Sequence, residues 1–526
     1  QFLGSPSLRG ARPVLSVNRP VSAPSPQLRL RAPVRSERPL GQLKASSTET
    51  FSDSNLKPTN DDNKDPDDYV LYGDRWVQLA LLSLLALLSD WACFAAVGGP
   101  KTWISSFHHN PDELIDLFLF SNVVSCFLFT DVSKRFGLKK SVTWAAGLMT
   151  LGCALRSGIS FLPPFDRYDW VVPDYLFEIT GTILIGIAQP FFQCSPPQLS
   201  ATWFGSNERA LATAVCLNAN QLGIATAFVV GGTMLTGKVP EALDEYLTMI
   251  TFASLAVFGG TVAWFKDRPP TPPTSSAARH AKEEDARRKA IAEGKDMGPF
   301  LTYPQTALSL LSNKGFLPPL AAFVASIGVT NVVSAFTSET MHRAGFVRDA
   351  IIDEIGAGFQ VAIMLGGIIL GRYVDRTKQY KGVTLACFGL TISTLCLLGI
   401  AEGYDMNLPG WMVVSSLIAL GASAGPVQPI NAELAVEVTY PSDENAVEAT
   451  QQLCGNLFSA LLVPICVAAS QLDWKILPGI GPNEDVRGDT LVLIVLASVV
   501  ALAFSTFNAE LKREALDSHH ETHEMK

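Results

Sequence analysis

The chain has 526 residues, of which 48% are apolar and 17% charged, and its formal net charge at pH 7 is -9. Its positive mean hydropathy of +0.24 excludes an ordinary array of soluble domains. The acidic balance gives nucleic-acid binding no support. These values predict an integral membrane protein.

Residues 1–70 form the first segment and contain no apolar run long enough to span a membrane. The first 50 residues are rich in Arg, Pro and Ser, with Glu37 and Glu49 as their only acids. This composition resembles an organellar transit peptide, which would place the protein in a plastid or mitochondrial envelope. A disordered tail on a plasma-membrane protein is the alternative.

Apolar stretches of roughly 20 residues, the length that a helix needs to cross a bilayer, recur from Trp76 to Asn508. They predict twelve transmembrane helices, at 76–98, 114–132, 141–162, 175–199, 210–235, 246–265, 316–340, 353–374, 382–402, 410–435, 445–470 and 490–508.

A long polar connector divides these spans six and six. It begins at Lys266 with a proline-rich stretch and continues with alternating charges from Arg279 to Lys295, which predicts a turn followed by a surface helix. We therefore expect an N-terminal six-helix lobe at 71–265, a linker at 266–300, a C-terminal lobe at 301–508 and a polar tail at 509–526.

Charges in the short loops predict the orientation. The exits of even-numbered spans are basic, with Lys134, Arg135, Lys139, Lys140, Arg209, Arg372, Arg376, Lys378 and Lys381. The opposite loops are acidic. By the positive-inside rule, the even-numbered exits, both termini and the linker lie on one side, called the basic side here, which is cytosolic or its organellar equivalent.

The two halves repeat each other. A shift of 236 residues superposes Pro190 on Pro426, the string SNERA at 206–210 on SDENA at 442–446, and Asn220 on Asn456. Several matches in one register favour parallel six-helix repeats. The predicted fold class is an all-α membrane protein with two pseudo-symmetric six-helix lobes.

The loop after the eighth span reads GRYVDRTK at 371–378, close to the G-x-x-x-D-R-x-G-R/K signature of the major facilitator superfamily. Gly371 permits close helix approach, and Asp375 can accept hydrogen bonds from a neighbouring helix N-terminus or a basic side chain. We expect Asp375 and Arg376 to form a latch that a conformational change must break. An ordinary stop-transfer charge cluster is the alternative.

Further gating residues are predicted on the basic side. The loop after the second span has Lys134 where the signature has its acid, and Asp131 is the expected substitute. Glu433 and Glu437 are four residues apart, on one helix face near the end of the tenth span. We expect them to pair with Arg209 or another loop base.

Polar groups inside a span are costly unless they face protein or water, so those near its middle are functional candidates. They fall in spans 1, 4, 5, 7, 10 and 11, which line the cavity of two-lobed carriers. The candidate substrate-binding residues are Asp90, Trp91, Gln189, Asn220, Gln221, Asn331, Gln452 and Asn456.

Asp90 beside Trp91 can hold a cation by charge and by cation–π attraction. The alternatives are a helix–helix hydrogen bond with a packed indole, and a protonated Asp90 that couples transport to protons. The amides of Asn220, Gln221 and Asn456 both donate and accept, which also suits a neutral or zwitterionic solute, although interhelical hydrogen bonds would use them equally.

Enzyme motifs are absent: the sequence has no HExxH, GxSxG or Walker A string, and its seven histidines lie in predicted loops or the tail. The nine cysteines all lie in apolar segments, where we expect small buried residues rather than disulfides or zinc ligands. We expect no enzymatic activity, metal or cofactor.

Several strings resemble the feline leukaemia virus subgroup C receptor-related transporters of the major facilitator superfamily. They are 186–191, 203–205, 220–223, 375–378 and 433–441. The resemblance covers roughly Trp76 to Gln471 and implies facilitated transport of choline or ethanolamine, with haem export also proposed for members. It also implies that Trp91 is an aromatic cage residue and Gln221 a binding glutamine.

The chain departs from the family pattern at three cavity positions. Asp90 replaces a glutamine, Ala335 with Phe336 beside it stands at the cage tyrosine, and Asn456 replaces a glutamine. We predict a monomeric carrier that moves a small organic solute, a choline- or ethanolamine-like cation, across the lipid bilayer by alternating access. The alternatives are a non-transporting receptor or scaffold with a carrier fold, and a proton-coupled carrier of another metabolite, including haem.

Overall fold

A computed structural model describes residues 70–96, 100–109, 111–157, 174–235, 241–293, 302–403, 410–470, 473–475, 485–508 and 510–516. The chain divides into two units, Gln1–Asn63 and Lys64–Lys526, and all described residues belong to the second. The predicted transit-like segment lies outside the described residues except for Val70.

The N-terminal lobe consists of long helices, two of which are built from consecutive pieces. They are α1 (Arg75–Cys93), α3 (Pro111–Phe136), α4 (Leu138–Arg156), the series α5 (Asp174–Ala188), α6 (Pro190–Gln193) and α7 (Pro196–Trp203), the series α8 (Arg209–Thr226), η4 (Ala227–Gly231) and α9 (Gly232–Leu235), and α10 (Glu241–Trp264). The short η2 (Phe94–Ala96) and α2 (Pro100–Phe107) follow α1.

The C-terminal lobe repeats this order. Its helices are α13 (Leu317–Arg343), α14 (Asp349–Thr377), α15 (Tyr380–Gly403), α16 (Gly410–Ala424) followed by α17 (Val427–Thr439), α18 (Glu444–Ser470) and α19 (Gly488–Ser505). Before α19, the strands β1 (Asp473–Lys475) and β2 (Asp485–Arg487) pair antiparallel, an addition that the all-α prediction did not contain. Between the lobes lie α11 (Ser275–Ala292) and α12 (Tyr303–Ser312).

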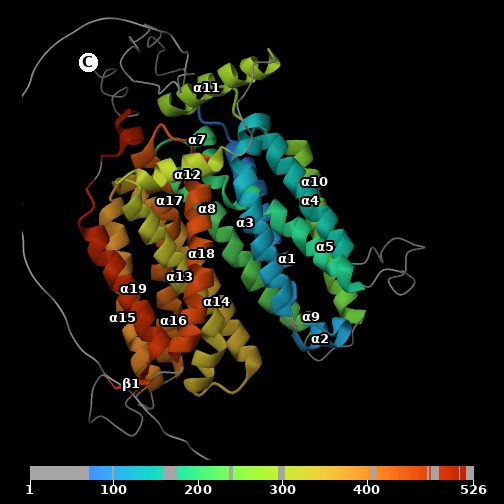
Figure 1. Cartoon of the computed structure of the whole chain (residues 1–526), viewed down its shortest axis with the longest axis vertical. Coiled ribbons are helices and arrows are strands. Elements are labelled where there is room, and N and C mark those ends of the chain that lie inside the picture. Colours follow the sequence, from blue (N-terminus) through green and yellow to red (C-terminus); the bar gives the residue numbers. More distant parts are fainter. Residues whose placement is uncertain are drawn as a thin grey trace, which may run out of the picture. The chain divides into compact units, whose positions relative to one another are not determined.

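Eleven helical segments of the described residues are long and apolar enough to cross a membrane. The third long helix, α4, falls short of that measure because Lys139, Lys140 and Arg156 lower its hydropathy, yet it packs against α5 and α10 as a full member of its lobe. The predicted fold of two six-helix lobes is confirmed, and Figure 1 shows α1, α4, α5 and α10 beside α13 to α19, with α11 at one end.

Both lobes break their fourth span at the same place in the repeat. Pro190 begins α6 directly after α5, and Pro426 caps α17 directly after α16. Proline lacks the backbone N–H and clashes with the preceding turn, so it interrupts the helix. The spans 175–203 and 410–439 therefore share an interruption at the same position of the repeat.

Helix α8 joins the lobes, because it packs against α1 on one side and α14 on the other. A Cβ atom at Gly223 would lie 2.2 Å from the carbonyl oxygen of Leu87 in α1. A Cβ atom at Gly371 would lie 3.0 Å from the carbonyl oxygen of Ala210. Glycine at these two positions is what lets the three helix backbones approach so closely.

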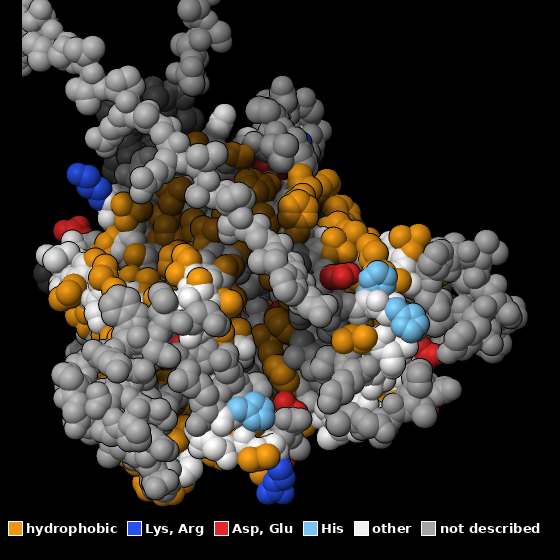
Figure 2. All heavy atoms as spheres, turned by 60° about the horizontal axis from the view of Figure 1, so that its bottom comes forward, with side chains coloured by type: hydrophobic (Ala, Val, Ile, Leu, Met, Phe, Trp, Pro, Cys, Tyr) orange, Lys and Arg blue, Asp and Glu red, His pale blue; other side chains and the backbone are white. Residues whose placement is uncertain are grey.

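Large apolar side chains face outward along the helices. Phe120, Leu461 and Leu502 are 68%, 67% and 70% exposed. Figure 2 views the end opposite α11, where hydrophobic side chains dominate the described surface and charged ones are scattered. An apolar surface of this extent requires lipid acyl chains around it.

Candidate functional site

A chain of polar side chains crosses the inside of the N-terminal lobe. Asp90 on α1 is 5% exposed, and its Oδ1 accepts a hydrogen bond of 2.7 Å from Nε2 of Gln189, which lies between α5 and α6. Asn122 on α3 donates to Oε1 of the same glutamine. The second oxygen of Asp90, Oδ2, has no hydrogen-bond partner among the described residues. Two predicted binding residues, Asp90 and Gln189, thus lie in contact.

Trp91 lies on a different face of α1 from its neighbour Asp90, because successive helix residues point about 100° apart. Its Nε1 donates a hydrogen bond of 2.9 Å to the hydroxyl of Tyr246 on α10. The two ring centroids are 6.5 Å apart. Trp91 therefore contacts a tyrosine that the sequence did not single out.

The other predicted binding residues are distributed over both lobes. On α8, Asn220 is 7% exposed with Oδ1 unpartnered in the described structure, and Gln221 is half-buried. On α13, the exposed Asn331 donates a hydrogen bond of 2.9 Å to Ser459 of α18. Asn456 is half-buried on α18. No hydrogen bond of the described residues joins this group to Asp90.

A second buried carboxyl, Glu448, lies on α18. Gln452, one turn later, donates a hydrogen bond of 2.8 Å to its Oε1. Both side chains are fully buried, and Glu448 Oε2 and Gln452 Oε1 have no hydrogen-bond partner in the described part of the chain. Glu448 is a titratable group within a span that the sequence reading overlooked, although an intramembrane Glu is itself the signal.

On the basic side, Asp375 at the end of α14 caps the first turn of α8. Its two oxygens accept hydrogen bonds of 2.8 and 2.7 Å from the backbone N–H groups of Ala210 and Leu211. A carboxylate at a helix N-terminus is favoured by the orphan N–H groups and the helix dipole. The hydrogen bonds expected of Asp375 are present, whereas Arg376 is exposed.

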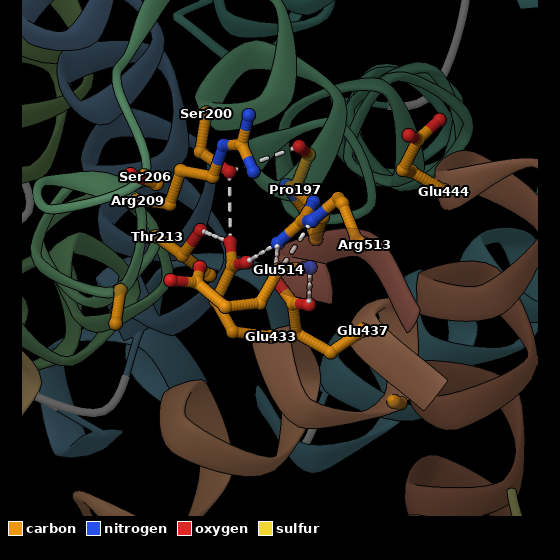
Figure 3. Close-up of polar contacts among 12 residues, drawn as sticks. Pro197, Ser200, Ser206, Arg209, Thr213, Glu433, Glu437, Glu444, Arg513 and Glu514 are labelled. Carbon is orange, nitrogen blue, oxygen red and sulfur yellow. Dashed lines mark hydrogen bonds and ion pairs between the residues drawn. The ribbon is translucent and has the colours of Figure 1, made fainter. Parts of the chain in front are cut away.

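Glu433 and Glu437 of α17 were expected to pair with Arg209 or another loop base, and the structure gives them a base other than Arg209. Their partner is Arg513, in the helical turn 512–516 that follows the last span (Figure 3). Its guanidinium donates to Glu433 Oε2 at 2.7 Å and to Glu437 Oε1 at 2.8 Å. Arg209 instead donates to Thr274 and Ser276 at the start of the linker helix.

Arg513 is 1% exposed, which corrects the expectation of a merely polar tail. Burial alone lowers the pKa of Arg513, but the carboxylates of Glu437 and Glu433 outweigh that effect and hold its pKa above the ordinary value. Glu433 also accepts hydrogen bonds from Ser200 and Thr213 of the N-terminal lobe (Figure 3). These residues, Ser200, Thr213, Glu433, Glu437 and Arg513, are called the basic-side network below.

The C-terminal end of α3 contributes a second set of contacts between the lobes. Asp131 accepts bonds from the N–H and hydroxyl of Thr302, at 3.1 and 2.7 Å, so it caps α12 rather than a span of the other lobe. Lys134 pairs with Asp443 at 3.1 Å. Asn445 donates to Ser133 and Gln198 at 2.9 and 2.8 Å. The end of α3 therefore contacts Asp443 and Asn445 at the start of α18 without copying the Asp375 latch.

The linker helix α11 covers this closed end. Nε2 of His280 lies 3.0 Å from Oε1 of Glu444, and this carboxylate raises the pKa of His280 to about 9 although burial opposes it. A polar cavity of about 430 Å³ lies between α11, α7 and the start of α18.

A buried ion pair and two cysteines differ from what the sequence predicts. Arg156 of α4 and Glu178 of α5 form a buried ion pair of 3.0 Å that the sequence reading missed, although both residues stand inside predicted spans.

The prediction of nine buried cysteines is wrong for Cys396, which is exposed, and for Cys454, which is half-buried.

Comparison with known proteins agrees with this geometry. The sequence model of the Major Facilitator Superfamily matches residues 79–463. Solute carrier family 49 member A3 of Xenopus tropicalis is 27% identical over 75% of this chain and 78% of its own. The choline/ethanolamine transporter flvcr2b of Danio rerio is 28% identical over the same shares. The human choline/ethanolamine transporter FLVCR2 is 24% identical over 72% of this chain and 66% of its own.

Solved structures share the fold. A double Trp mutant of XylE has a TM-score of 0.61 at 16% identity, covering 85% of this chain and 98% of that chain. The major facilitator transporter FucP in the outward conformation has a TM-score of 0.57 at 12% identity, covering 83% and 100%. The predicted resemblance to the feline leukaemia virus subgroup C receptor-related transporters is confirmed by the relatives above. The chain belongs to the major facilitator superfamily and is a multi-pass membrane transporter of small solutes.

Proposed function

We propose that the protein carries a choline- or ethanolamine-like organic cation and that Asp90 is the anionic anchor of its site. The observation that carries this proposal is the state of Asp90, a buried carboxyl whose Oδ2 has no partner and to which no ion pair is assigned in the described structure. An ionised carboxylate in such a place costs several kcal/mol unless a cation joins it. The names of the relatives in zebrafish and human support an amine of this class.

Neighbouring groups suit the rest of such a substrate. Gln189 holds Asp90 in place through one oxygen and leaves the other available. Trp91 and Tyr246 supply aromatic surface within the same lobe, and an aromatic face attracts a quaternary ammonium. Asn220 offers an unpartnered carbonyl oxygen to a hydroxyl group.

Alternating access is the proposed mechanism, with the protein working as a monomer. The basic-side network, Asp375 and Asn445 all join the lobes at the same end. The two lobes would rock about α8 and α14, so that these contacts break when the basic side opens. In this proposal Asp131, Arg209, Asp375, Arg376, Glu433 and Glu437 act in gating.

Uptake by the full chain in proteoliposomes tests the substrate and the anchor together. We expect saturable uptake of labelled choline or ethanolamine, with Asp90→Asn reducing uptake at least about tenfold because a charge-assisted contact is lost. Trp91→Ala should reduce it as well, whereas Trp144→Ala, at a 54% exposed position, is the matched control. Unchanged uptake in both site variants would show that the anchor lies elsewhere.

For the membrane, we propose an organellar envelope from the composition of residues 1–50. Fusing residues 1–70 to a fluorescent protein and imaging the product tests this. Plastid or mitochondrial fluorescence is expected, and a diffuse signal would contradict the assignment.

A further inference from the structure

Glu448 is, like Asp90, a buried acid of the described spans that no base accompanies. Glu178 has Arg156 at 3.0 Å, and Glu433 has Arg513 at 2.7 Å. Within the described part of the chain, Glu448 has the amide of Gln452 on one oxygen and no hydrogen-bond partner on the other. The neighbouring Gln452 Oε1 also lacks a donor, so acceptors exceed donors at this point and one additional proton would be accommodated.

The position of Glu448 couples it to the contact between the lobes. It lies one turn of α18 beyond Asn445, whose side chain bonds Ser133 and Gln198 of the other lobe. Helix α18 packs against α3 and α7 in this region. Separation of the lobes on the basic side would therefore bring water to Glu448, which is dry while they are closed.

Among the described residues, the titratable groups found near Glu448 do not supply a positive charge. From α17, Glu433 adds a negative charge, although its own partner Arg513 compensates it. The turn between α6 and α7 contributes the thiol of Cys194. Cys126 of α3 and Tyr303 of α12 lie beyond Cys194 and are uncharged. Asp489 of α19 lies near Cys466, toward the opposite end of α18.

An ionised carboxylate in these surroundings costs several kcal/mol, so the neutral form is favoured while the site is closed. Hydration after opening removes that cost. We propose that Glu448 binds a proton when the basic side is closed and releases it to basic-side water when the lobes separate there, so that transport is linked to protons through this residue. The inference rests on the proposed alternating access.

The sign of the effect follows from linkage. The closed state binds one more proton than the open state, so acid favours closure and alkali favours opening. The closed state loses this proton at a higher pH than the open state does. Between those two pH values, the ratio of open to closed molecules rises by up to about tenfold for each pH unit. Neutral Gln at position 448 imitates the protonated group and should remove this dependence.

Spin labels at Lys140→Cys and Tyr373→Cys report opening, because both side chains are exposed and stand near the basic-side ends of different lobes. Cys396 and Cys454 are first replaced by Ser. Distances between the labels are measured by double electron-electron resonance in lipid nanodiscs from pH 5.5 to 8.5, without substrate. In the wild type we expect the population with the longer distance to grow as the pH rises. Glu448→Gln should keep the short distance at every pH. Glu448→Asp should again respond to pH.

Glu354→Gln is the matched control, because that carboxyl is exposed on α14 and should leave the pH response unchanged. A wild type whose distances ignore pH, or a Glu448→Gln variant that responds like the wild type, overturns the proposal. Both outcomes are independent of choline uptake. Loss of uptake with an intact pH response would instead count against the proposed substrate alone.

Discussion

At the scale of single residues, Arg513 joins parts of the chain that the helix pattern keeps separate. It stands after the last span, yet it links two acids of α17, one of which also binds Ser200 and Thr213 of the other lobe. The guanidinium suits this task because its fixed fork of donors reaches two carboxylates at once. One buried cation thereby holds the negative charges of the basic-side network in place.

Arg513→Ala should open the basic side. Removing one partner of a buried ion pair costs about 3–5 kcal/mol, because the remaining carboxylates stay buried without a cation. The label pair at 140 and 373 should shift toward the longer distance, and the melting temperature should fall by several degrees. Lys512→Ala changes an exposed cation in the same turn and serves as the control. Equal behaviour of the two variants would contradict a closing role for Arg513.

At the scale of elements, α8 and α14 form the contact about which the lobes are proposed to move. Gly371 and Asp375 occupy one face of α14, four residues apart. The glycine admits the backbone of α8, and the aspartate then binds the N–H groups of Ala210 and Leu211. The close approach and the hydrogen bonds therefore depend on each other.

Gly371→Val tests this dependence. The added methyl groups meet the carbonyl oxygen of Ala210 and the Cβ of Ala214, at 3.0 and 3.1 Å from the first new carbon, so α8 must move away from Asp375. We expect transport to fall at least about tenfold, with a lower melting temperature. At Gly389 of α15 a Cβ would meet nothing within 4 Å, so Gly389→Val should have much smaller effects. Similar losses in both variants would argue against the close approach.

The linker helix is held to α18 by His280 and Glu444, and this attachment should depend on pH. Because the pKa of His280 is raised to about 9, the ion pair is fully present below its ordinary value of 6.5 and is lost as the pH rises through 9. The wild type should melt about 1 °C above His280→Gln at pH 6, and this difference should vanish at pH 10. A difference that stays constant with pH would exclude the ion pair as its cause.

At the scale of the whole molecule, the sequence was sufficient for the two lobes because each span is a long apolar run and the kinks recur at Pro190 and Pro426. The candidate site was harder to predict. Asp90 and Gln189 could be identified because a polar side chain inside a membrane span has a high free-energy cost. Their contact with each other depends on how the helices pack, which the sequence pattern does not give. Arg513 lies in a short polar segment with no pattern of its own, and its partners are far away in sequence.

The two matched kinks carry one more consequence, which concerns the segments that follow the spans. The shift that places Pro190 on Pro426 also places Ala277 of the linker helix on Arg513. Each half of the chain thus ends its six spans with a helical segment that closes the same end, and each is bonded to the lobes beside it. The correspondence between the halves therefore reaches beyond the spans, because each half carries a bonded helical segment on the basic side, although Ala277 and Arg513 are unlike residues.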